Sequence, residues 1–123
     1  MLLDNFYKIE QQIEIDSGFE YTISLNKEHA IYKAHFPGNP ITPGVCIIQI
    51  CKELMEQHTG ESLFLQKIQN VKFLSIIDPT ITNRVKVLFS KISSETDGYK
   101  CSNLMIYWET TQFTKLSIYL QRR

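Results

Sequence analysis

A loop dense in proline and glycine, followed by an apolar segment, limits what this chain can fold into more than any other feature. Within eight residues the loop contains Pro37, Gly38, Pro40, Pro43 and Gly44. Proline fixes φ and glycine permits positive φ, so the loop should follow a rigid, defined path. Beyond it the chain is almost wholly apolar, which predicts a buried helix over 45–59, with Gly60 as its stop signal.

This arrangement presents His35, at the start of the loop, next to the N-terminus of the buried helix. A helix N-terminus has free N–H groups and a partial positive charge. It is therefore a natural place to hold a carbonyl or anionic oxygen.

The rest of the chain reads mainly as strands. Segments with strand-like patterns cover 6–15, 19–25, 64–77, 81–92, 99–110 and 113–121. Ile9, Ile13 and Ile15 are expected on one face of the first segment, and the apolar phase shift between Ile68 and Val71 predicts a β-bulge. A short turn or helix is expected around 28–31.

One helix and about six antiparallel strands predict a single α+β domain over residues 1–123, because an apolar sheet face needs a helix to cover it. Exposed sheet edges would favour two subunits that pair their sheets. The formal net charge is zero, which does not favour nucleic acid, and no apolar run approaches the ~20 residues of a membrane span. Cys46 and Cys51 are expected in the core, and an odd cysteine count without a signal sequence indicates a reducing cytoplasm.

The loop resembles the signature of the 3-hydroxyacyl-acyl-carrier-protein dehydratases, which have the hot-dog fold, a long helix wrapped by an antiparallel sheet. The resemblance rests on His35, Phe36, Pro37, Gly38, Pro40, Pro43, Gly44 and Val45. It implies that His35 removes the proton α to the thioester carbonyl, a step suited to an imidazole near neutral pH. It also implies that the N–H of Gly44 or Val45 holds the enolate oxygen, and that Phe36, Pro37, Gly38 and Pro43 help to bind the substrate.

Position 49 departs from that family. The family has a catalytic Glu or Asp there, which protonates the leaving 3-hydroxyl, whereas this chain has Gln49. An amide cannot deliver a proton at neutral pH. Glu53 lies one turn further on, so the family's order of Glu then Gln is exchanged. Glu53 is then either a displaced acid or, as its charged neighbours Lys52 and Glu56 favour, a solvated carboxylate.

The resemblance implies acyl-carrier-protein or acyl-CoA thioesters as ligands and a homodimer or a heterodimer with a related dehydratase. No cofactor is expected, and no His, Cys or Asp spacing suggests a metal site. Two alternatives stay open: a non-catalytic acyl-thioester-binding subunit of a heterodimer, and an acyl thioesterase. Lys67, Lys72, Arg84 and Lys86 could offer a basic patch to an acidic carrier protein, although a solvated strand face also explains them.

Overall fold

The structure is a computed structural model that describes residues 1–35 and 38–123. The described chain forms, in order, β1 (Tyr7–Ile15), β2 (Gly18–Leu25), α1 (Ala30–His35), α2 (Gly44–Thr59), β3 (Leu63–Phe73), β4 (Arg84–Ser94), β5 (Gly98–Trp108) and β6 (Thr111–Arg122). None of these helices is long and apolar enough to cross a membrane.

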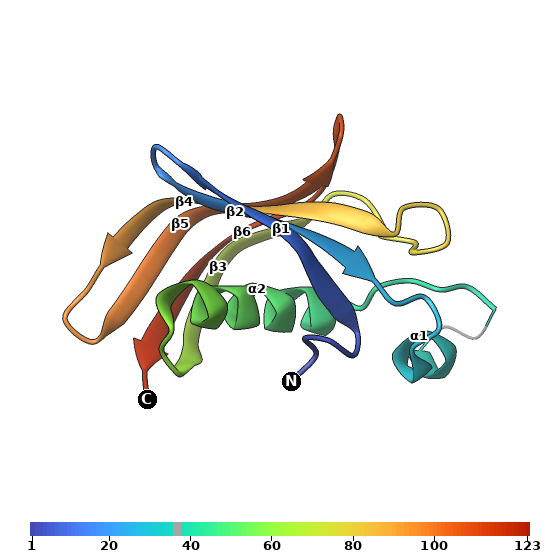
Figure 1. The fold of residues 1–123 in the computed structure, drawn as a ribbon, viewed down its shortest axis with the longest axis horizontal. Coiled ribbons are helices and arrows are strands. Elements are labelled where there is room, and N and C mark those ends of the chain that lie inside the picture. The colour runs from blue at the N-terminus through green and yellow to red at the C-terminus, as the bar shows by residue number, and fades with distance from the viewer. Residues whose placement is uncertain (36–37) are drawn as a thin grey trace.

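The strands form one antiparallel six-stranded sheet in the order β1-β2-β4-β5-β6-β3, so β1 and β3 are its edges. The sheet curves over one side of α2, while α1 lies beyond the end at which α2 begins (Figure 1). This confirms the predicted architecture of one long helix and about six antiparallel strands. The expected short helix also exists, but as α1 it begins later than predicted and includes His35.

The core lies between the sheet and α2. Phe19, Tyr21, Ile23 and Leu25 occupy alternate positions of β2 and are buried, as the strand-like pattern over 19–25 predicts, and Glu20 between them is buried as well. From α2 the buried set is Cys46, Ile47, Ile50, Cys51, Glu53, Leu54 and Met55. Full burial of one large aliphatic or aromatic side chain is worth about 1.5–3 kcal/mol, so this layer holds α2 against the sheet.

The predicted bounds of α2 are confirmed to within one residue. Gly60 adopts φ 73° and its N–H donates to the carbonyl of Glu56, which ends the helix. The expectation of a buried helix is wrong for one flank of α2 in the single chain, because Val45 is 71% exposed. The sheet covers α2 from one side only, and the flank that carries Val45 stays open.

Two edge strands differ from expectation in detail. A bulge between Ile9 and Gln11 shifts the register of β1, so that Ile9 pairs with Ile23 and Ile13 pairs with Glu20. Directly paired residues point to the same side of a sheet, and Ile23 and Glu20 are on opposite sides. Ile9 and Ile13 therefore do not share a face, contrary to the prediction.

The predicted bulge in β3 is confirmed by a register shift between Gln69 and Lys72. The strand ends at Phe73 rather than at residue 77, because the N–H groups of Leu74 and Ser75 both turn to the carbonyl of Phe113. The chain then leaves the sheet and passes the start of α2.

Candidate functional site

The first turn of α2 leaves two backbone N–H groups, those of Gly44 and Val45, available as donors. The N–H groups of Cys46 and Ile47 donate to the carbonyl of Pro43 (3.0 and 3.1 Å), and the helix has no side-chain cap. Among the described residues, the N–H groups of Gly44 and Val45 have no acceptor in this turn. A helix N-terminus in this state is able to hold a carbonyl or developing enolate oxygen, the role that the resemblance implies for the N–H of Gly44 or Val45.

An apolar groove of about 310 Å³ opens at the same end of the helix. Its lining consists of Ile41, Thr42, Gly44, Ile47, Phe73, Leu74, Ser75, Ile76 and Ile77. The ring of Phe73 packs so closely on Gly44 that a Cβ there would lie 2.9 Å from its Cζ. Glycine at position 44 therefore lets the aromatic ring reach the helix start. Two larger hollows, of about 450 and 460 Å³, are lined mainly by polar residues of the 4–8, 24–28 and 79–83 segments.

Thr42 fixes the segment that leads into α2. Its N–H and its Oγ1 both donate to the carbonyl of Ile77, at 2.9 and 3.0 Å, and its Oγ1 lies 2.9 Å from the hydroxyl of Tyr32. Burial raises the pKa of Tyr32 to about 12, so its hydroxyl stays protonated at neutral pH. These contacts tie α1, the entry to α2 and the 74–77 segment together.

Within one chain, the described structure shows no polar contact between His35 and Gln49, the predicted acid position. His35 is the exposed last residue of α1, not a loop residue as expected, because the helix continues through it. Within the described residues, no hydrogen bond or ion pair joins it to Gly44, Val45 or Gln49. Gly38, at φ 78°, is exposed, and the predicted ligand contacts at Phe36 and Pro37 fall outside the described residues.

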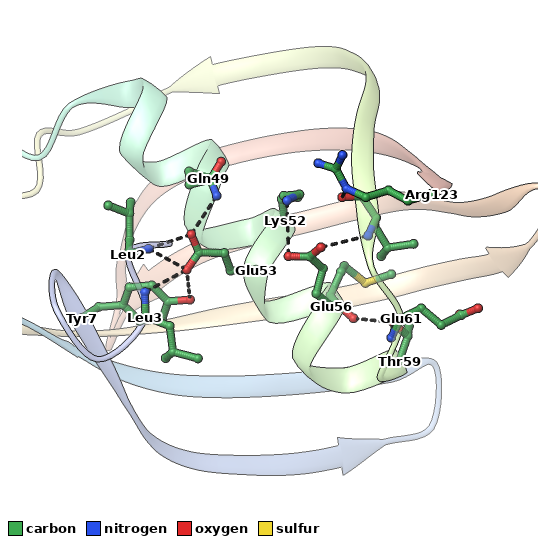
Figure 2. A network of polar contacts seen from close by, with 12 residues as sticks. Leu2, Leu3, Tyr7, Gln49, Lys52, Glu53, Glu56, Thr59, Glu61 and Arg123 are labelled. Carbon is green, nitrogen blue, oxygen red and sulfur yellow. Dashed lines mark hydrogen bonds and ion pairs between the residues drawn. The ribbon is translucent and has the colours of Figure 1, made fainter.

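Glu53 is only 1% exposed, so the interpretation of this residue as a solvated carboxylate is wrong. Its Oε2 accepts from the N–H of Leu2 at 2.9 Å and its Oε1 from the N–H of Leu3 at 2.8 Å. The hydroxyl of Tyr7 donates to Oε1 at 3.2 Å, and the Nε2 of Gln49 donates to Oε2 at 2.7 Å (Figure 2). Four donors from three parts of the chain thus surround one carboxylate.

Tyr7 is held in the donor state by this environment. Burial, together with the adjacent Glu53 carboxylate, raises the pKa of its hydroxyl far above the usual value. Sequence analysis missed Tyr7, Thr42 and Phe73 as site residues. Tyr7 could not be found from spacing, because it is 46 positions from Glu53 and is brought there by the docking of β1.

Gln49 lies on the less buried flank of α2 that also carries Val45, Lys52 and Glu56. Lys52 and Glu56 form an ion pair at 3.3 Å further along this flank (Figure 2). Gln49 is half-buried, so one end of its amide meets Glu53 while the other remains accessible. An acyl ligand that follows the flank from the helix N-terminus would meet the side chain of Gln49.

The predicted basic patch is divided by the sheet order. Lys67 and Lys72 are on β3, whereas Arg84 and Lys86 are on β4, and two other strands lie between these elements. Lys86 also lies 3.8 Å from the carboxylate of Glu20. The four residues therefore do not form one continuous surface for an acidic partner.

Comparison with known proteins agrees with this architecture. The model of the ApeI-like family, described as ApeI dehydratase, matches residues 10–104. A 3-hydroxyacyl-[acyl-carrier-protein] dehydratase FabZ of Levilactobacillus brevis is 30% identical over 115 residues, 82% of this chain and 76% of that protein. The FabZ of Latilactobacillus sakei is 30% identical over 77 residues, 57% of this chain and 54% of that protein. The chain thus spans about three quarters of the Levilactobacillus brevis protein and about half of the Latilactobacillus sakei protein.

Two solved structures share the fold. The dehydratase heterocomplex ApeI:P from Xenorhabdus doucetiae aligns with a TM-score of 0.68 at 15% identity, over 93% of this chain and 96% of that one. An uncharacterized protein from Erwinia carotovora aligns with a TM-score of 0.60. The predicted hot-dog fold and the predicted resemblance to 3-hydroxyacyl-acyl-carrier-protein dehydratases are both confirmed. The chain belongs to the ApeI-like dehydratase family.

Proposed function

We propose that this chain binds 3-hydroxyacyl thioesters at the N-terminal end of α2, as a dehydratase-like component of acyl-chain synthesis in the cytoplasm. The thioester carbonyl would accept from the N–H groups of Gly44 and Val45. The acyl chain would follow the open flank of α2 that carries Val45 and Gln49, starting beside the apolar groove that Phe73 and Ile77 help to line. An acyl carrier protein is the preferred carrier, since the matching relatives are named for carrier-linked substrates; coenzyme A remains the alternative.

The observation that carries the catalytic part of the proposal is the state of Glu53. Gln49 occupies the position of the family's acid, and the carboxylate one turn away is buried and hydrogen-bonded to four donors. A carboxylate engaged in this way is not a free proton donor for a substrate hydroxyl. The homodimer should therefore bind the substrate and dehydrate it slowly.

The same observation favours a second function, that of a non-catalytic subunit in a heterodimer whose partner supplies the missing carboxylate. The ApeI:P structure, a chain of which shares this fold, is described as a dehydratase heterocomplex. A thioesterase is disfavoured because it would need an available carboxylate to activate water, and Glu53 is occupied.

The test is an assay of the purified protein, free of host dehydratase, with 3-hydroxyoctanoyl-pantetheine and detection of the conjugated enoyl product by absorbance. We expect the thioester to bind and the wild-type rate to lie ~10²–10⁴-fold below that of an active dehydratase, because a general acid is missing. Fast turnover that survives His35→Ala and Glu53→Gln together would contradict the proposed site.

We further propose that the site is completed by a second subunit. His35 is exposed on α1, and among the described residues no hydrogen bond or ion pair joins it to Gln49 of its own chain. The β3 edge also exposes Phe64, Val71 and Phe73, and the segment after it exposes Leu74 and Ile76. A free edge strand with apolar side chains is suited to pairing with another copy.

The dimer is tested with a matched pair of substitutions. Val71 on β3 and Ile15 on β1 are both 36% exposed on edge strands. We expect sedimentation of the wild type at micromolar concentration to give twice 14.4 kDa. Val71→Asp should yield monomer, since it places a charge in the proposed interface, and Ile15→Asp should leave the dimer intact. A wild-type monomer under these conditions would exclude the shared site.

A further inference from the structure

The two ends of the Gln49 amide are in different environments. The end that faces Glu53 lies 2.7 Å from a carboxylate oxygen and is the NH₂ group, because a carboxylate can only accept hydrogen bonds. The other end, Oε1, has no hydrogen-bond partner among the described residues and is not buried. It points away from Glu53 (Figure 2).

The opposite orientation of the amide is excluded by the same contact. Turning it over would place Oε1 against the carboxylate oxygen and replace a charge-assisted hydrogen bond by contact between two acceptors. Glu53 has no freedom to adapt, since Leu2, Leu3 and Tyr7 hold its oxygens from the other side. The carboxylate therefore dictates which atom of Gln49 faces outward.

We infer that Glu53 is a positioning residue that makes Gln49 a fixed hydrogen-bond acceptor, and that this acceptor selects ligands with a 3-hydroxyl group. The inference rests on the proposed function, since it requires the acyl thioester to pass Gln49. A 3-hydroxyl can donate to Oε1. A 3-oxo group is only an acceptor, so it would leave two acceptors facing each other and is rejected.

This orientation also fits a proton supplied from elsewhere. A hydroxyl that donates its hydrogen to Oε1 keeps its lone pairs free to accept a proton from an acid on another subunit. Gln49 would then orient the 3-hydroxyl. The carbon–oxygen bond would break only when the second subunit protonates this hydroxyl, which then leaves as water. An exchanged Gln–Glu pair is thus suited to holding a substrate without converting it.

The test compares three ligands: 3-hydroxyoctanoyl, 3-oxooctanoyl and octanoyl pantetheine, each with the thioester sulfur replaced by NH to prevent turnover. Dissociation constants are measured by calorimetry on the purified full chain. We expect the hydroxy ligand to bind the wild type about 10-fold more tightly than the oxo ligand. Gln49→Leu, which removes the acceptor, should bring this ratio close to 1 while octanoyl binding is kept.

The role of Glu53 is tested by Glu53→Gln, which can both donate and accept and so lets Gln49 adopt either orientation. We expect the hydroxy-to-oxo ratio to fall towards 1. The matched control is Glu56→Gln. Glu56 lies one turn beyond Glu53 and bonds to Leu63 and Lys52 instead of Gln49, so this variant should keep the wild-type hydroxy-to-oxo ratio.

The outcomes separate the two proposals. Equal binding of all three ligands to the wild type would overturn the acceptor role and leave the proposed function standing. An unchanged ratio in Glu53→Gln would overturn the positioning role of Glu53. Failure of all three ligands to bind would overturn the proposed function and this inference together.

Discussion

Gln49→Glu should convert a slow homodimer into a working dehydratase. The substitution is nearly isosteric and restores the carboxyl group that protonates the leaving hydroxyl. We expect the dehydration rate to rise at least ~10-fold and as much as ~10²–10⁴-fold, the range that a general acid supplies. The measurement is the appearance of enoyl product from a 3-hydroxyacyl thioester, with Glu56→Gln as a control that should leave the rate at the wild-type level.

The pH profile should distinguish this variant from Gln49→Glu combined with Glu53→Gln. In the single variant the new carboxyl lies beside the Glu53 carboxylate, and like charges raise the pKa at which the pair loses its shared proton. Because the protonated form is the active acid, activity is lost as pH rises through that pKa. The single variant should therefore stay active to higher pH than the double variant, in which the neighbour is a neutral amide.

Addition of His35→Ala should remove the gain in dehydration rate both from Gln49→Glu and from its combination with Glu53→Gln. If instead the wild type is already fast and Glu53→Gln alone abolishes its activity, Glu53 is the displaced acid and its hydrogen bonds do not prevent proton transfer. That result would reverse the assignment of roles at positions 49 and 53.

Glu53→Leu should be the most destabilising change in the polar network. It deprives two backbone N–H groups, the hydroxyl of Tyr7 and the amide of Gln49 of their acceptor. Each buried donor left unsatisfied costs about 1–3 kcal/mol, and part of the set can turn to water. We expect the free energy of unfolding to fall by about 3 kcal/mol and the melting temperature by about 10 °C, as measured by circular dichroism.

Two smaller changes calibrate this effect. Tyr7→Phe removes one donor and leaves the carboxylate in place, so it should cost about 1 kcal/mol. Glu56→Leu removes a more exposed carboxylate, which accepts from the N–H of Leu63 at 2.8 Å, and should also cost about 1 kcal/mol. A loss in Glu53→Leu no larger than in Glu56→Leu would show that the network contributes little to stability.

The sequence predicts those parts of this molecule that local chemistry controls. Pro43 and Gly60 mark the two ends of α2 because one restricts φ and the other permits positive φ. The apolar residues at alternate positions of β2 predict its buried face, because successive side chains of a strand point to opposite sides of the sheet. The bulge in β1 escaped prediction because the isoleucines there are spaced as in a regular strand, and only the pairing with β2 reveals the extra residue.

The environment of Glu53 could not be predicted for a different reason. Neighbouring positions on a helix point about 100° apart, so the charge of Lys52 says little about where Glu53 faces. Its main partners are backbone N–H groups near the start of the chain, and backbone groups carry no sequence signature. The role of His35 was predicted from a motif, whereas its place as the exposed last residue of α1 emerges only from the structure.

The docking of residues 2 and 3 onto α2 joins positions that are 50 and 51 apart in the sequence. Closing a loop of that length has an entropic cost that local helix formation does not have, so this junction should form late in folding and open early. When it opens, Glu53 loses its restraints and the amide of Gln49 is free to turn. The hydrogen-exchange rates of the Leu2 and Leu3 amides would therefore report how much of the time the Oε1 atom of Gln49 is held towards the ligand. Deletion of these two residues would alter ligand selectivity although neither residue is proposed to contact the ligand.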